Sequence, residues 1–289
     1  MMMRTMDSAR FNRGTGLLVV AARMSNINGD PDMNNDPRMD SRGIGLVSPV
    51  SVHRKLRDLV GEKGDHWNAF RDKMGLDSQY FDILETRGRD RAEIIKGLAT
   101  NGGQEQALDR YWDARVFGCT FLDEATEAGG FIRTGVLHFG CGESIQPLEV
   151  ERLTLTNKAG VEEGKDRGMA PNAYRVARNA LYAIPFFVDP TRANATRCSA
   201  NDIQLALNLI PYIYESSKSL LRSQVYIRKA WYVEHRSPIG SCPDHLILGA
   251  LMPTLDEETG DTECYSIPDS LEEELLTRVK SVENLMERI

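Results

Sequence analysis

Residues 16–60 constrain the fold most, because they join an apolar run, a polar stretch and an amphipathic segment. The run GLLVVAARM (16–24) holds two adjacent β-branched residues and is short, which favours a buried strand over a helix. The next stretch, 25–45, is dense in Asn, Asp, Pro and Gly, the residues that form turns. Ser48 is a good N-cap, and Pro49 is tolerated at the first helical position. The sequence therefore predicts a strand, a long loop and a helix.

The predicted helix has an apolar stripe at 3.6-residue spacing, formed by Val52, Leu56, Leu59 and Val60. The basic side chains off this stripe are His53, Arg54, Lys55 and Arg57. A loop rich in amide groups, followed by a basic helix face, fits a chain of phosphates. The alternative is an ordinary solvated helix with surface Arg and Lys.

Composition indicates a globular chain: of 289 residues, 41% are hydrophobic and 27% are charged. The length fits one domain with insertions, or two domains. The sequence lacks an apolar run long enough for a membrane span, and its first residues lack the apolar core of a signal peptide, so we expect neither membrane association nor export. The five cysteines contain no CxxC pair, which argues against a zinc site or a disulfide framework and for reduced thiols in the cytoplasm.

The net charge of −7 is unevenly distributed. Residues 251–289 hold 11 acidic and 3 basic residues, whereas residues 1–250 hold 31 acidic and 32 basic ones. Phosphate binding depends on where charge is located and not on the total, so the acidic tail does not exclude a nucleic-acid partner.

The remaining patterns predict a largely helical insertion at 62–114, a helix at 199–216 with a kink at Pro211, and a last helix that starts at a Ser270/Glu273 capping box. Strands are predicted at 115–122, 131–139, 149–156, 179–188, 224–234 and 246–252. Without insertions the order is βαββαβ, an α+β fold of the ferredoxin-like type that RNA-recognition sheets also use. The usual aromatic RNA-binding signature is not evident.

Residues 149–178 predict a strand, an exposed tip and a returning strand, with Lys158, Lys165 and Arg167 at the tip. A two-stranded hairpin cannot bury both faces alone, so we expect it to pack on another molecule. Further basic residues lie in 86–91 (TRGRDR), at Arg133 in one strand and at Arg228 beside Lys229 in another.

Catalytic and metal motifs are not apparent. Residues 30–36 begin like an EF-hand loop, but the sixth position is Asn35 where Gly is needed and the twelfth is Ser41 where Glu is needed. The five histidines lack metal-ligand spacing, and the sequence contains neither a P-loop nor a nucleophile elbow. We therefore expect no catalytic residue, metal or cofactor. The loop carboxylates are either turn-formers or, alternatively, groups for a metal-assisted cleavage of RNA.

Several motifs together resemble one family. These are Asn28–Asp32, Asn35–Asp40, Gly45–Val47 and Arg54-Lys55, followed by Asp113–Gly118, Gly135–Pro147 and Tyr232–Gly240. In this order they are similar to the backbone subunit of type I CRISPR surveillance complexes (Cascade), a member of the RAMP superfamily. The similarity covers about residues 16–250 and is greatest to the type I-C and I-B forms.

The resemblance implies one hand-like domain over 1–289: a modified RNA-recognition-motif palm, a helical insertion at about 62–114 and a β-hairpin thumb at about 149–178. It implies a non-catalytic protein of antiviral defence whose copies polymerise head to tail along a CRISPR RNA and present it for pairing with target DNA. The other implied partners are the large subunit and the RNA-end-binding subunit of the complex.

Two departures from the family pattern affect the predicted contacts. Residues 25–30 read Ser-Asn-Ile-Asn-Gly-Asp where the family has Asn-Pro-Asn-Gly-Asp-Pro, and residues 168–171 lack the two bases of its Met-Gly-Arg-Lys segment. Basic residues near that segment would substitute for the missing ones. The predicted RNA-binding residues are Asn26, Asn28, Asp30, Arg38, His53, Arg54, Lys55, Arg57, Arg133, Lys165, Arg167, Arg175 and Arg228.

Two other functions stay open on the sequence. One is an RNA-cleaving RAMP subunit that would use Asp30, Asp32 or Asp36 of the loop. The other is a stand-alone binder of single-stranded nucleic acid.

Overall fold

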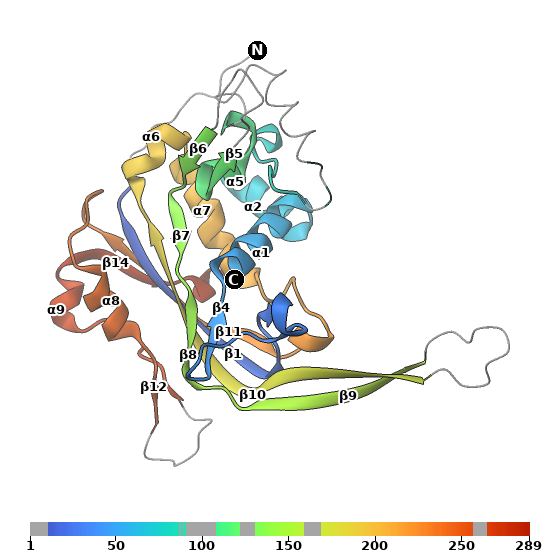
Figure 1. The fold of residues 1–289 in the computed structure, drawn as a ribbon. Helices are drawn as coiled ribbons and strands as arrows, with labels where there is room; N and C mark the ends of the chain where they lie inside the picture. Colours follow the sequence, from blue (N-terminus) through green and yellow to red (C-terminus); the bar gives the residue numbers. More distant parts are fainter. Residues whose placement is uncertain are drawn as a thin grey trace.

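The computed structural model describes residues 11–86, 88, 90, 108–121, 131–158, 169–256 and 265–289. Within them, the main feature is an eight-stranded antiparallel sheet (Figure 1). Its main order is β14 (Val279–Asn284), β11 (Val225–His235), β1 (Gly14–Ser25), β10 (Met169–Val188), β8 (Gly142–Pro147) and β4 (Ile44–Val47). Strands β7 (Leu137–Phe139) and β9 (Val150–Lys158) also pair with β10.

Strand β1 lies at the centre of this sheet, as its apolar sequence predicts. It pairs with β10 from Gly14↔Val188 to Ser25↔Ala177, and with β11 on its other side. Gly16 permits close packing, because a Cβ there would lie 2.0 Å from the ring of Phe186. The predicted strand at 16–24 is thus confirmed.

Helices cover both faces of the sheet. Helices α1 (Pro49–Gly61), α2 (Asp65–Met74) and α7 (Ala200–Leu209) belong to the larger core cluster, which includes Leu18 and Val20 of β1. Helices α8 (Asp244–Leu251) and α9 (Glu273–Leu276) pack against Leu17 and Val19, whose side chains point to the opposite face. The predicted helix after Ser48 is confirmed as α1.

A two-stranded ribbon projects from the sheet (Figure 1). Strand β9 pairs with the first half of β10, from Val150↔Ala177 to Lys158↔Met169, while the second half of β10 lies in the main sheet. Strand β1 ends at the Ser25↔Ala177 pair, so the ribbon beyond it has no third strand among the described residues.

Three of the elements predicted after residue 198 differ in the structure. The sequence predicts a strand at 246–252, but these residues lie mostly in helix α8. It predicts a single helix for the last segment, but α9 ends at Leu276 and β14 follows, because Val279–Asn284 pairs with β11. Helix α7 ends at Leu209, where a 3-10 turn containing Pro211 replaces the predicted kinked helix.

The smaller elements complete the described chain. The sequence predicts a strand at 115–122, but α5 (Trp112–Val116) precedes β5 (Gly118–Phe121), so Arg115 lies in a short helix. Strand β5 pairs with β6 (Phe131–Thr134), β2 (Gly29–Asp30) with β3 (Asp36–Pro37), and β12 (Thr254–Leu255) with β13 (Tyr265–Ser266); α6 spans Ala193–Thr196. Among the described residues, none of the helices is long and apolar enough to cross a membrane.

Candidate nucleic-acid interface

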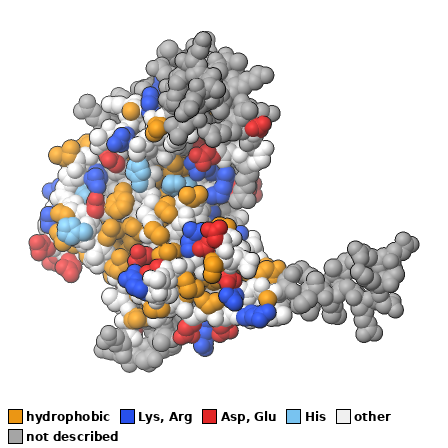
Figure 2. Space-filling view, viewed as in Figure 1, with side chains coloured by type: hydrophobic (Ala, Val, Ile, Leu, Met, Phe, Trp, Pro, Cys, Tyr) orange, Lys and Arg blue, Asp and Glu red, His pale blue; other side chains and the backbone are white. Residues whose placement is uncertain are grey.

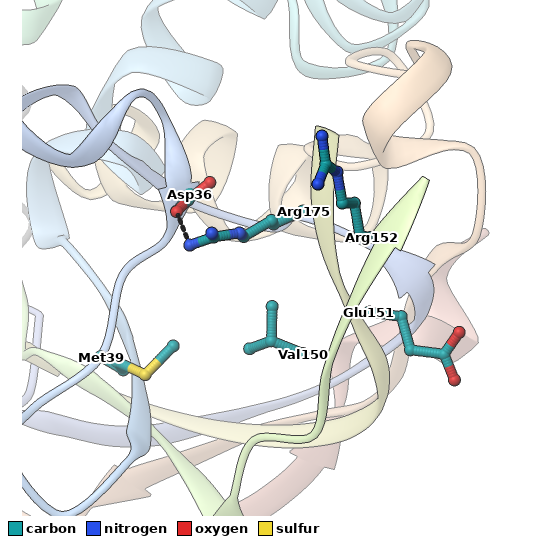
Figure 3. A pocket seen from close by; sticks show the side chains of 6 residues that line it. All are labelled: Asp36, Met39, Val150, Glu151, Arg152 and Arg175. Atoms are coloured by element: carbon teal, nitrogen blue, oxygen red, sulfur yellow. Dashed lines mark hydrogen bonds and ion pairs between the residues drawn. The ribbon is translucent and has the colours of Figure 1, made fainter. Parts of the chain in front are cut away.

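A cavity of about 250 Å³ lies where the polar loop after β1 meets the base of the β9–β10 hairpin (Figure 3). Two apolar side chains, two guanidinium groups and two carboxylates line it: Met39, Val150, Arg152, Arg175, Asp36 and Glu151. Guanidinium groups bind phosphate, while exposed aliphatic surface contacts sugars and bases. The guanidinium groups and the apolar side chains of the lining could therefore contact a nucleotide chain, whereas its two carboxylates would repel phosphate.

Two arginines face each other across the base of the hairpin. Arg152 of β9 pairs directly with Arg175 of β10 in the antiparallel register, so both side chains leave the same side of the ribbon. Nη1 of Arg175 lies 2.7 Å from Oδ2 of Asp36, and Arg175 points toward that residue in Figure 3. Arg152 is exposed and forms no ion pair with any described residue. Like charges directly opposite each other repel, so an anion at this position would relieve the repulsion.

The loop is built largely by its own amide side chains. Oδ1 of Asn28 accepts a hydrogen bond from the backbone N–H of Ser48 at 2.7 Å, which ties the loop to the start of α1. Gly29 packs on Asn35, since a Cβ at position 29 would lie 2.0 Å from Oδ1 of Asn35. Asn34 and Asn35 have positive φ angles of 51° and 62°, a conformation that Asn adopts more readily than most residues. The Asn and Gly residues of this loop therefore fix its backbone geometry.

Asn26, one of the predicted RNA contacts, is only 3% exposed and lies beneath the loop. Its Nδ2 donates to the carbonyl of Asn35 at 2.7 Å. Oδ1 of Asp30 accepts from the backbone N–H of Asp32 at 3.1 Å and lies 3.6 Å from a guanidinium nitrogen of Arg38. Asn26 is therefore buried in the free chain, while Asp30 and Arg38 are partly exposed, and RNA binding by these three residues stays a prediction.

Helix α1 does not present the predicted basic face. Lys55 is 8% exposed and Arg57 is 6% exposed, so both are buried. Nε of Arg57 lies 3.0 Å from Oδ2 of Asp113, and its Nη2 lies 3.1 Å from Oε2 of Glu85. Nζ of Lys55 donates to Oγ of Ser51 at 2.9 Å. The pattern misled because segments distant in the sequence cover the side of α1 that a lone helix would expose to water.

The two other basic residues of α1 are only partly exposed. Arg54 forms an ion pair with Asp58 at 2.8 Å and donates to the carbonyl of Glu85 at 2.6 Å. His53 stacks on Phe117 with ring centroids 4.4 Å apart. Burial, together with the positive charge of Arg57, lowers the pKa of His53 to about 4. The imidazole is therefore neutral at pH 7 and adds no positive charge for phosphate.

The motif Asp113-Ala-Arg115 has a structural role that the sequence did not reveal. Oδ1 of Asp113 accepts from the backbone N–H of Leu84 at 2.7 Å, in addition to the bond between its other oxygen and Arg57. Nη2 of Arg115 lies 2.7 Å from Oδ1 of Asp202. The motif thus joins α1, the segment around residue 84 and α7.

The remaining predicted contacts are dispersed. Arg133 is half-buried on β6, and Arg228 is exposed on β11. Lys165, Arg167 and three arginines of the 86–91 cluster fall outside the described residues. The sequence predictions missed four residues that line the cavity: Met39, Val150, Glu151 and Arg152. The signal for Arg152 was its place in the alternating strand EVERLTLT, opposite a strand that contains Arg175.

Acidic residues of the loop take part in local bonds. Asp30 caps the turn that follows it, Asp36 pairs with Arg175, and Asp40 accepts from the backbone N–H groups of Arg42 and Ile44. Within the described ranges, no three His, Cys, Asp or Glu side chains gather as metal ligands would.

Comparison with known proteins assigns the family. The model of the family described as CRISPR-associated protein Cas7 matches residues 12–270, and the chain belongs to this family. No curated protein matches the chain. Among solved structures, one described as "CRISPR RNA-guided surveillance complex, pre-nicking" is similar at 12% identity and a TM-score of 0.46, over 78% of each chain. Another, described as "CRISPR RNA-guided surveillance complex", is similar at 14% identity and a TM-score of 0.41, over 78% of this chain and 70% of the other.

Proposed function

We propose that this chain is a CRISPR RNA-binding backbone subunit of a type I surveillance complex, of the I-C or I-B kind. Membership of the Cas7 family and the cavity between the polar loop and the hairpin support the proposal. The observation that carries it is that Arg152 and Arg175 lie directly opposite each other. Among the described residues, a single carboxylate, that of Asp36, pairs with Arg175, and none pairs with Arg152. One phosphate of the guide RNA would bridge the two guanidinium groups and position the strand without reading its sequence.

The proposed architecture is a single RAMP-type domain over 1–289. The strand order β11–β1–β10–β8, with α1 and α7 on one face, supports a ferredoxin-like palm. The projecting ribbon of β9 and β10 would be the thumb, at about 149–178, and the segment at about 62–114 would be the insertion.

The ribbon also supports assembly of copies head to tail. A two-stranded ribbon is marginally stable unless something packs against it. A heterologous contact with the next copy would provide that surface and, because it does not close on itself, would build a filament along the RNA. The filament would present the guide for pairing with target DNA and meet the large and RNA-end-binding subunits. We propose that the subunit acts in the cytoplasm in antiviral defence, without a cofactor and without catalysis.

The dependence of particle mass on the length of the guide RNA tests this proposal. The full chain would be co-expressed with CRISPR RNAs of two spacer lengths, and the purified particle would be sized before its nucleic acid is extracted. We expect RNA in the particle and a mass that rises with spacer length. A stand-alone binder would give particles whose copy number does not follow the guide, and a chain that stays monomeric and free of RNA at modest ionic strength would overturn the proposal.

The same purified particle can test the alternative function, cleavage of RNA. The guide-loaded particle is incubated with complementary RNA and Mg²⁺. We expect intact RNA, whereas regularly spaced cuts that disappear in Asp32→Asn would establish an enzyme.

A further inference from the structure

We propose that the open end of the sheet face opposite α1 and α7 is a second binding surface for single-stranded nucleic acid, built around Tyr226. It uses none of the residues that line the cavity, and only Arg228 of the RNA-binding residues predicted from the sequence, so it goes beyond the proposed function. The surface consists of one exposed aromatic ring and four cations: Tyr226, Arg23, Lys218, Arg228 and Lys229.

Strand register places Tyr226 and Arg23 on the same face. Tyr226 of β11 pairs with Ala21 of β1. Ala21 packs with Leu17 and Val19, which face α8 and α9, and alternation puts Arg23 on that side as well. Arg23 is thus a diagonal neighbour of Tyr226, a spacing that aromatic and long side chains bridge.

The covering helices stop short of this end of the sheet. Helices α8 and α9 bury Trp231 and Val233 farther along β11. Tyr226 is 45% exposed, although Nζ of Lys218 lies 4.0 Å from its ring centroid. Arg23 is exposed too. A large aromatic ring exposed on a sheet face offers a stacking surface for a base, because every base has an aromatic face.

Four cations and two carboxylates lie around the ring, so the charge there is mainly positive. Figure 2 colours Lys and Arg blue and Asp and Glu red over one face of the molecule. Neither Arg23 nor Arg228 forms an ion pair with any described residue. The two other cations have carboxylate partners: Nζ of Lys218 lies 3.5 Å from Glu215, and Nζ of Lys229 lies 3.0 Å from Asp269.

A backbone irregularity lies within the surface. Val19 pairs with Lys229, whereas Val20 pairs with Ile227, so Arg228 is an extra, unpaired residue in β11. Such bulges redirect side chains and are frequent beside binding sites.

An aromatic platform flanked by cations selects unpaired strands, because in a duplex the base faces are already stacked. The sugar-phosphate and base chemistry is shared by a guide RNA and by a displaced DNA strand. Both sources therefore belong in the test.

Fluorescence anisotropy of the full-length protein tests the surface. Labelled single-stranded DNA and RNA of mixed sequence are titrated into free protein and into guide-loaded protein. The variants are Tyr226→Ala, Tyr226→Phe and Arg23→Gln, and Arg42→Gln is the control for an exposed arginine elsewhere. Thermal unfolding of each variant checks that the fold is retained.

We expect Tyr226→Ala to weaken binding about 5-fold or more, Tyr226→Phe to retain it, and Arg42→Gln to match the wild type. Binding that guide loading blocks would assign the surface to the guide, and binding that survives loading would assign it to a second strand. If Tyr226→Ala and Arg23→Gln bind both oligonucleotides as the wild type does, the inference is overturned. Failure to load a guide would reject only the proposed function, since the free protein still reports on Tyr226.

Discussion

Arg115 and Asp202 form a completely buried ion pair, in which neither side chain is exposed and Nη2 lies 2.7 Å from Oδ1. All five guanidinium donors of Arg115 are used, because Nε and Nη2 bond Asp202 and the remaining hydrogens reach the carbonyls of Leu108, Asp109 and Tyr80. This arginine therefore holds α5, α7 and the segment around residue 80 together.

Replacing Arg115 with Ala should lower the free energy of unfolding by about 3–5 kcal/mol, because the carboxylate of Asp202 would stay buried without its partner. Urea unfolding measures the change. The control is Arg110→Ala, whose exposed pair with Asp82 should contribute about 1 kcal/mol or less. Equal losses of stability in the two variants would contradict the structural role of Arg115.

Arg57→Ala should affect stability and leave the electrostatics of RNA binding unchanged. Arg57 is buried beside Asp113, so its removal should cost on the order of 3 kcal/mol. The slope of log affinity for RNA against log salt should equal that of the wild type, since the slope counts phosphates neutralised by the protein. A flatter slope in folded Arg57→Ala would show that this residue does reach the RNA.

The double variant Arg152→Gln/Arg175→Gln should weaken RNA binding and flatten the salt slope by about 0.7 for each phosphate that is no longer neutralised. Both side chains are exposed at the hairpin base, so the unfolding midpoint should change little. Arg178→Gln is the matched control, because Arg178 is exposed on the same strand but pairs with Glu149. RNA binding that survives in the double variant would reject the cavity as the phosphate site.

Asp36→Asn should tighten RNA binding about 2- to 5-fold. Asp36 occupies Arg175 in the free protein and would compete with an incoming phosphate, while an exposed ion pair contributes about 1 kcal/mol or less to stability. Affinity is measured at fixed salt, with Asp32→Asn as the control for removing a negative charge from the same loop. A gain of the same size in both variants would mean that only the overall charge matters.

Stability should fall in acid partly through His53. Its pKa is about 4 in the folded protein against about 6.5 unfolded, so only the unfolded chain binds the proton between these values. The free energy of unfolding therefore falls by about 1.4 kcal/mol per pH unit, or by about 3 kcal/mol in total, as the pH falls from about 6.5 to 4. His53→Phe, which can keep the stacking on Phe117, should flatten this part of the profile.

His245→Gln is the control for removing a histidine, because His245 is exposed. The pH dependence that remains in His53→Phe includes a contribution from His235, because burial lowers the pKa of His235 as well. An identical pH profile for His53→Phe and the wild type would contradict the assignment.

Local sequence patterns correctly predicted those elements whose tertiary surroundings favour the same secondary structure as their own residues. The apolar run at 16–24 became the central strand, and the cap at Ser48-Pro49 marked the start of α1. The same reasoning failed for the last segment, where the spacing of Leu271, Leu275, Val279 and Val282 fits a helical stripe. Pairing with β11 converts Val279–Asn284 into an edge strand, and no local pattern reports a partner strand some 50 residues away.

By itself, the sequence determined the strand–loop–helix at residues 16–60 and, through its motifs, the resemblance to the CRISPR backbone family. Only the tertiary structure decided which cations are available to a ligand. Lys55 and Arg57 look exposed on a helical wheel but are buried, because distant segments cover them: Tyr214 lies beside Lys55, and Asp113 and Glu85 pair with Arg57. Arg152 and Arg175 face each other only because of the register of the hairpin. Burial and cross-strand opposition are relations between distant segments, and a one-dimensional pattern does not contain them.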